Sequence, residues 1–218
     1  MKFFIDSANI DAITEIDKTG MLDGVTTNPS IIAKSGLDFL EVIKEISTIL
    51  GDRPVSAECV SLDHETMMKE AEKLLTLGDN IAIKVPLTVD GLKTCKNLSD
   101  NGVDVNVTLC FSANQALLAA KSGARYISPF VGRHDDYGLE GMELIEDICN
   151  VYDNYDFTTE VLVASARHPN HVLQASKIGA DVITIPPAVF SQLYKHPYTD
   201  LGLEAFEKDW AETGQSIL

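Results

Sequence analysis

Polar side chains recur at the ends of short apolar segments in this sequence. Asp6, Glu58 and Lys84 each lie at or near the end of such a segment. Amides, hydroxyls and a guanidinium hold comparable places elsewhere: Thr26, Thr27, Asn28, Asn106, Thr108, Ser128, Ser165 and Arg167. Because the carboxyl ends of parallel strands meet at one edge, these residues predict a single site that contains an amine and two carboxylates.

Lys84 lies in the apolar segment 81–86, where burial would strip water from its ammonium group. Burial favours the neutral amine, which attacks carbonyl groups, whereas neighbouring carboxylates favour the charged form. The alternative interpretation is a lysine that extends from a strand end into solvent. The residue pattern leaves both interpretations open, and Lys84 is the candidate nucleophile.

Asp6 and Glu58 are the two carboxylates that can share an edge with Lys84. Two carboxylates can divide the proton transfers of one reaction between them. Asp6 also has a structural alternative, because Asp-Ser-Ala-Asn is a good capping sequence for a helix that begins near Asn9. Glu58 lies in an apolar strand, where a carboxylate must be paired or functional because isolated burial of charge is costly.

The chain has four arginines, and two of them, Arg133 and Arg167, follow predicted strands. Together with the hydroxyl of Ser165 they supply donors suited to a phosphate group. A protein with a formal charge of −16 needs such local cations to attract an anionic substrate. The alternative is a surface ion pair between either arginine and a nearby acid: Asp135, Asp136 or Glu160.

The overall composition excludes several classes of protein. The excess of 33 acidic over 17 basic residues repels nucleic acids and anionic membrane surfaces. The four cysteines form no CxxC pair, which argues against a zinc site or a disulfide framework. The five histidines lack metal-ligand spacing and are predicted on the surface or in loops. No segment is typical of a signal peptide or a membrane span, so we expect a cytoplasmic protein.

The elements that must position these residues follow a repeating pattern. Apolar segments alternate with amphipathic stretches such as 39–46 and 67–75, which predicts repeated βα units in one domain over residues 1–218. The eight apolar segments are 3–5, 24–26, 55–60, 81–85, 103–109, 126–130, 161–164 and 182–185. Eight units favour a closed (β/α)₈ barrel, the TIM-barrel fold, over an open doubly wound sheet, which is the alternative.

A further amphipathic stretch, 199–212, follows the eighth unit. Leu203, Phe206 and Trp210 share one of its faces by their helical spacing. A closed barrel does not need this helix, so the segment 199–218 is predicted to be a C-terminal tail. The helix either covers an end of its own barrel or docks on a neighbouring subunit.

Five motifs resemble the transaldolase family, in particular its short form near the fructose-6-phosphate aldolases. The motifs are Asp6-Ser-Ala-Asn9, Gly24-Val-Thr-Thr-Asn-Pro-Ser30, Ile83-Lys-Val-Pro86, Ser128-Pro-Phe-Val-Gly-Arg133 and Ala164-Ser-Ala-Arg167. They occur in order, and the resemblance spans nearly the whole chain. One departure is Ala166, where larger residues are common, and it alters the site without removing a donor.

The resemblance implies a role for each candidate residue. Lys84 would form a Schiff base with the ketose C2 carbonyl, Asp6 would handle the C4 hydroxyl proton, and Glu58 would shuttle protons through a water. Glu58 and Thr108 would hold that water together. The dihydroxyacetone fragment would be held by Asn28, Asn106 and Ser128. The substrate phosphate would be bound by Arg133, Ser165 and Arg167. The protonated imine is the electron sink, so this chemistry requires no metal or organic cofactor.

The resemblance further implies transfer of dihydroxyacetone from sedoheptulose 7-phosphate or fructose 6-phosphate to glyceraldehyde 3-phosphate or erythrose 4-phosphate, in the pentose phosphate pathway. The alternative is a fructose-6-phosphate aldolase, a lyase that releases dihydroxyacetone. Glu58 and Phe130 favour the transferase, since the aldolases tend to have glutamine and tyrosine there. Similar short-form members assemble as pentamers or decamers, so a homo-oligomer is expected. A non-catalytic sugar-phosphate-binding barrel would not need the buried amine. An aldose–ketose isomerase is a further alternative, but a buried lysine with amide partners suits imine chemistry better than simple proton transfer.

Overall fold

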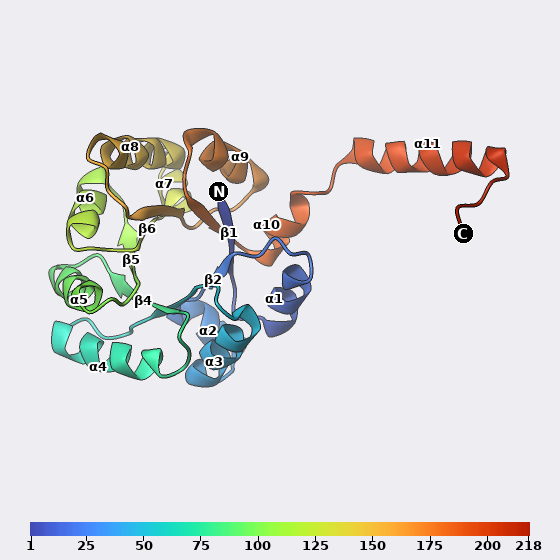
Figure 1. Cartoon of the computed structure of the whole chain (residues 1–218). Helices are drawn as coiled ribbons and strands as arrows, with labels where there is room; N and C mark the ends of the chain where they lie inside the picture. The colour runs from blue at the N-terminus through green and yellow to red at the C-terminus, as the bar shows by residue number, and fades with distance from the viewer.

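Eight parallel strands close into a barrel in the computed structural model, which describes all 218 residues (Figure 1). The strands are β1 Lys2–Asp6, β2 Gly24–Thr26, β3 Val55–Glu58, β4 Ile81–Pro86, β5 Val105–Cys110, β6 Tyr126–Pro129, β7 Glu160–Val163 and β8 Val182–Ile185. Each strand pairs with the next in the chain, and β1 pairs with β8. The predicted (β/α)₈ barrel is confirmed. The open sheet is wrong, because an open sheet would leave two strand edges unpaired.

Helices surround the barrel and connect its strands. They are α1 Ile10–Asp17, α2 Pro29–Ser35, α3 Phe39–Leu50, α4 His64–Leu75, α5 Val89–Asp100, α6 Ala113–Lys121, α7 Val131–Asp135, α8 Gly141–Asn154, α9 Pro169–Ile178, α10 Pro187–Gln192 and α11 Pro197–Thr213. Polar side chains fix several of the starts, as where Asp38 accepts from the backbone N–H of Glu41. The short helices α2 and α7 stand between a strand and its main helix, so they lie at the carboxyl end of the barrel.

The interior of the barrel is apolar in its middle layer. Phe4, Ala82, Tyr126 and Leu162 are buried together there, and the rings of Phe4 and Tyr126 meet edge to face at 5.9 Å. Gly24 makes room for Phe4, since a Cβ at position 24 would lie 2.6 Å from its ring. Bulky side chains therefore fill the barrel as a packed core.

A polar layer lies directly above this apolar one. Side chains two residues apart on a strand face the same side, so the residues after the middle layer also face inward. Asp6 follows Phe4 in this way, and Lys84 follows Ala82. The corresponding residues of other strands are Thr26, Asn106, Ser128 and Thr184, all buried. The interior of the barrel is therefore more polar at its carboxyl end than in its middle layer.

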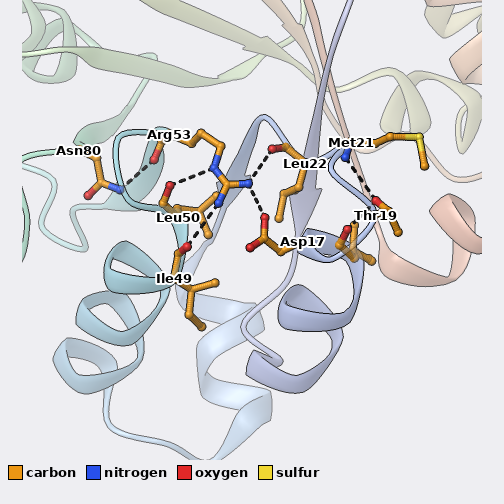
Figure 2. A network of polar contacts seen from close by, with 9 residues as sticks. Asp17, Thr19, Met21, Leu22, Ile49, Leu50, Arg53 and Asn80 are labelled. Atoms are coloured by element: carbon orange, nitrogen blue, oxygen red, sulfur yellow. Dashed lines mark hydrogen bonds and ion pairs between the residues drawn. The ribbon is translucent and has the colours of Figure 1, made fainter.

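A network of polar contacts around Arg53 lies at the amino-terminal end of the barrel (Figure 2). Its guanidinium donates to the carbonyl oxygens of Leu22 at 2.9 Å, Leu50 at 2.9 Å and Ile49 at 3.3 Å, and pairs with Asp17. Asn80 in turn donates to the carbonyl oxygen of Arg53 at 2.8 Å. The network joins the connections that lead into β2, β3 and β4.

The C-terminal helix α11 projects away from the barrel (Figure 1). None of its residues is buried, and Phe206 is 72% exposed. Of the two alternatives for this helix, the one in which it covers its own barrel is therefore wrong. No helix of the chain combines the length and apolar character that crossing a membrane requires.

Candidate active site

A cavity of about 510 Å³ opens at the carboxyl end of the barrel. It collects residues from strands β1 to β6 and β8, from the loop that follows β7, and from helices α2 and α7. The predicted site residues that line it are Asp6, Asn28, Glu58, Lys84, Ser128, Phe130, Arg133 and Ser165. Three others lie outside the lining: Asn106, Thr108 and Arg167. The topology thus brings most of the predicted set together.

Lys84 is 5% exposed and does not extend into solvent, so the alternative of a solvent-directed lysine is wrong. Its Nζ lies 2.9 Å from Oε2 of Glu58 and donates to the carbonyl oxygen of Thr27 at 3.0 Å. Glu58 and Lys84 are register partners on β3 and β4, so the barrel itself holds the pair together. A buried amine next to a carboxylate can lose its proton to that carboxylate and then attack a carbonyl carbon.

The thiol closest to this pair in sequence is a poor alternative nucleophile. Cys59 follows Glu58 and is 5% exposed. Burial raises the pKa of the Cys59 thiol to about 12, and the charges of Glu70 and Glu58 add to the effect. The reactive thiolate is therefore scarce near neutral pH.

Asp6 lies in the polar layer beside Lys84. Burial raises the pKa of Asp6, while the charge of Lys84 and a hydrogen bond from Thr26 at 2.8 Å partly oppose the shift. Thr26 also shares a hydrogen bond of 2.7 Å with Thr184 on β8. Asn9, not Asp6, caps helix α1, so the capping alternative for Asp6 is wrong.

A chain of hydrogen bonds crosses the barrel below the cavity. Ser128 donates to Oδ1 of Asn106 at 2.7 Å, and Nδ2 of Asn106 donates to Ser56 at 3.1 Å. These bonds orient Ser128 at the cavity wall while leaving Asn106 fully buried. The Thr108 hydroxyl is also fully buried, and no protein group bonds to it. A buried polar atom without a protein partner is a natural place for a bound water.

Two residues at the cavity rim have unusual backbone conformations. Leu109 and Ser165 have φ angles of 60° and 58°, in the left-handed region that side chains other than glycine rarely adopt. Leu109 coincides with a register shift between β5 and β6. Both residues line the cavity. Such conformations cluster at functional sites because the surrounding structure must hold them.

The candidate phosphate-binding side of the cavity contains Ser165 and Arg133. Arg167 is not part of the cavity lining and makes a two-pronged ion pair with Asp136, in which Nη2 lies 2.7 Å from Oδ2. Arg133 approaches the same carboxylate at 3.8 Å. The predicted alternative, an ion pair of the arginines with Asp136, is thus present in this structure. Both arginines thus share one carboxylate.

Asn28 and Phe130 at the cavity rim also contact neighbouring parts of the fold. The Asn28 Oδ1 caps helix α2 by accepting from the backbone N–H of Ile31 at 2.9 Å, which leaves its amide nitrogen for other partners. Phe130 packs edge to face on Phe111 at 5.8 Å. Phe111 stacks on His134 in turn, so aromatic contacts join the segment after β5 to helix α7.

Sequence reasoning missed several residues of this cavity. Thr184 lines the cavity because it follows the interior residue Val182 by two positions. Alternate residues of a strand face the same side, so the sequence could have predicted this placement. Lys34 lines it from helix α2, and no spacing rule places it there.

His171 was predicted on the surface or in a loop, yet it lies on α9 and is 3% exposed. That prediction is wrong, because the ring packs inward under the site.

Comparison with known proteins decides the family of the chain. Residues 3–217 match the family described as Transaldolase/Fructose-6-phosphate aldolase. The chain belongs to the transaldolase/fructose-6-phosphate aldolase family. Its curated relatives include a "Probable transaldolase" from Sphingopyxis alaskensis, 68% identical over 217 residues. Proteins of the same name from Rhizorhabdus wittichii and Erythrobacter litoralis are 67% identical over 218 residues. Each of these alignments covers 100% of both chains. The resemblance inferred from the five motifs is therefore confirmed, and the cavity that holds Lys84 is the candidate active site of a member of this family.

Proposed function

We propose that this protein is a transaldolase, which moves a dihydroxyacetone unit from sedoheptulose 7-phosphate or fructose 6-phosphate to glyceraldehyde 3-phosphate or erythrose 4-phosphate. One observation carries the proposal: a buried lysine amine lies 2.9 Å from a carboxylate inside the cavity. The names of the relatives and the presence of Glu58 with Phe130 support transfer over simple release of dihydroxyacetone. The proposal includes a cytoplasmic location, where the sugar phosphates of the pentose phosphate pathway occur.

The reaction begins when Glu58 accepts a proton from the Lys84 ammonium. The neutral Nζ attacks C2 of the ketose, and the carbonyl oxygen takes up a proton to give a carbinolamine. Loss of that oxygen as water forms the protonated imine between Nζ and C2. Glu58 supplies and removes the protons of these steps, and a water bound by the unpartnered Thr108 hydroxyl extends its reach.

Asp6 then takes the proton of the C4 hydroxyl. The C3–C4 bond breaks, its electron pair moves into the imine to give an enamine, and the shortened aldose phosphate leaves as an aldehyde. Burial, which raises the pKa of Asp6, makes this carboxylate a stronger base than an exposed aspartate. The acceptor aldehyde reverses the same steps, and Asp6 returns its proton to the new hydroxyl.

Binding of the substrate follows the polarity of the cavity. Ser128, oriented by Asn106, faces the hydroxyls of the dihydroxyacetone part, and the Asn28 amide nitrogen adds a donor. Arg133 and Ser165 meet the phosphate at the opposite side. Arg167 joins them when phosphate replaces the Asp136 carboxylate, since both anions use the same face of the guanidinium.

Chemical trapping tests this function. The protein is incubated with fructose 6-phosphate and borohydride, and peptide mass mapping then locates the reduced adduct. We expect the adduct on Lys84 alone. A parallel assay measures dihydroxyacetone released without acceptor and sedoheptulose 7-phosphate formed with erythrose 4-phosphate. Labelling of another lysine would remove Lys84 from its role, and release as fast as transfer would make the protein a lyase.

We further propose that the protein is a homo-oligomer joined through helix α11. The face formed by Leu203, Phe206 and Trp210 is exposed over a helix of 17 residues. Light scattering of a triple serine variant of this face should give a smaller particle than wild type. Leu201→Ser, on the opposite face and 58% exposed, is the matched control and should leave the size unchanged. An unchanged size in the triple variant would refute the role of the helix.

A further inference from the structure

Arg167 is held at both its ends by two consecutive acidic residues, one that ends helix α7 and one that follows it. Asp136 binds the guanidinium directly. Asp135 acts at the other end through a histidine: the Arg167 backbone N–H donates to Nδ1 of His171 at 3.1 Å, and Nε2 of His171 lies 3.1 Å from Oδ2 of Asp135. The backbone and the side chain of the arginine are thus both tied to the end of α7.

The hydrogen bonds define the protonation state of His171. Because Nδ1 accepts a hydrogen, the neutral ring must carry its own proton at Nε2, which faces the Asp135 carboxylate. The other Asp135 oxygen, Oδ1, accepts from the backbone N–H of Gly141 at 3.1 Å. The imidazole therefore bridges the loop after β7 to the start of α8 through Asp135.

The segment that this bridge supports is strained and tightly packed. Ser165, two residues before Arg167, has a φ of 58°. A Cβ at Gly132 would collide with the Ser165 backbone oxygen and with Nε of Arg167, so α7 lies directly against this loop. Ser165 and Arg167 are therefore packed directly against the helix that carries Arg133.

The groups around His171 favour its neutral form. Burial and the His168 ring, whose centroid lies 3.7 Å away, lower the pKa of His171. The carboxylates of Asp135 on α7 and Glu140 at the start of α8 oppose the shift without reversing it. The backbone N–H of Arg167 also points at Nδ1, where the imidazolium would place a second hydrogen. Protonation therefore breaks the bond to Arg167.

We propose that His171 is a positioning residue, which holds Arg167 and Ser165 in place for the substrate phosphate while its ring is neutral and releases them when it is protonated. This inference rests on the proposed function, in which these residues bind phosphate. It predicts that phosphate affinity falls in acid, below the ordinary pKa range of histidine, while the chemistry at Lys84 continues.

Two variants of His171 test the positioning role. An asparagine at this position would place its carbonyl oxygen near the place of Nδ1, so His171→Asn keeps an acceptor that does not titrate, whereas His171→Ala removes it. We expect His171→Ala to raise the KM for fructose 6-phosphate about tenfold, with kcat changed less than about threefold. His171→Asn should restore most of the KM. His64→Asn, which alters a histidine whose Nδ1 bonds Thr94 on another side of the barrel, is the control.

The pH profile separates positioning from a purely structural role. Binding of inorganic phosphate is measured by calorimetry between about pH 5 and 8 for wild type, His171→Asn and His64→Asn. Phosphate itself titrates in this range in every sample, so the difference between profiles isolates His171. Affinity of the wild type and of the His64 variant should fall more steeply in acid than that of His171→Asn.

Three outcomes would overturn the proposal. The first is the same dependence of phosphate affinity on pH in wild type and His171→Asn. The second is an unchanged KM in His171→Ala. The third is an equal rise in KM in the alanine and asparagine variants when circular dichroism shows that both are folded. Failure of the proposed function has a different signature. In that case wild-type Lys84 would not be labelled with saturating fructose 6-phosphate, whereas phosphate binding and its dependence on His171 would be measured regardless.

Discussion

The two ends of the barrel use charged residues in opposite ways. At the amino-terminal end, the Arg53 guanidinium donates to three backbone carbonyls and forms an ion pair with the Asp17 carboxylate, which it shares with no other cation. At the carboxyl end, Arg133 and Arg167 share the one carboxylate of Asp136, and burial raises the pKa of Asp6. Saturated charges hold connections together. Charges that share partners or resist ionisation remain available for a substrate, and they cost stability.

The largest effect that this comparison predicts is at Lys84. Lys84→Met should lower transfer activity by at least about 10⁴-fold, because it removes the amine that pairs with Glu58, and Lys34, the other lysine of the cavity lining, makes no ion pair with that carboxylate. Far-ultraviolet circular dichroism should be unchanged. The matched control is Lys93→Met, which alters an exposed lysine on α5 that pairs only with Asp90. If Lys84→Met kept more than about a hundredth of the activity, the chemistry would lie elsewhere.

Arg53→Met tests the opposite end of the barrel. It should lower the free energy of unfolding by about 3 kcal/mol, since the carbonyls of Leu22 and Ile49 and the Asp17 carboxylate lose their donor. The kcat of the folded fraction should stay within about twofold of wild type. Urea titration and steady-state kinetics measure the two quantities. A large fall in kcat with an unchanged free energy of unfolding would contradict the structural role assigned to Arg53.

Arg167→Ala should affect binding more than stability. We expect the KM for fructose 6-phosphate to rise about 30-fold, equivalent to about 2 kcal/mol, while kcat changes little. The free energy of unfolding should fall by less than about 1 kcal/mol, because the ion pair with Asp136 is exposed. Activity on unphosphorylated fructose is the internal control. An equal loss on both sugars would contradict a phosphate-binding role.

The smallest predicted effect is a gain of stability at Asp6. Because its folded pKa is raised, the carboxylate destabilises the fold at pH values above the ordinary aspartate range, and this cost disappears in acid. Asp6→Asn keeps an oxygen that accepts from Thr26 and should raise the free energy of unfolding by about 1 kcal/mol at neutral pH. The difference from wild type should vanish near about pH 3. Urea titrations at both pH values measure it, and a constant difference would refute the ionisation argument.

The sequence predicted the barrel and most of the site because both depend on local patterns. The change from Phe4 to Asp6 and from Ala82 to Lys84 appears in the sequence as an apolar run that ends in a polar residue. Parallel strands bring all such ends to one edge, so the topology turns these local patterns into one cavity. The candidate nucleophile, the two carboxylates and the polar contacts of β5 and β6 follow from this rule.

Other features depended on contacts between distant segments, and only the tertiary structure decided them. The sequence named Asp136 only as one of three acids that could pair with an arginine. It did not predict that His171 would be buried beneath Arg167, because these contacts join the end of α7 to the loop after β7 and to α9. Nor did the periodicity of α11 decide whether its apolar face covers the barrel. The direction of the chain after β8 decides that, and it carries the helix away. Local periodicity determines which face of an element is apolar, whereas the packing of the whole chain determines what each face meets.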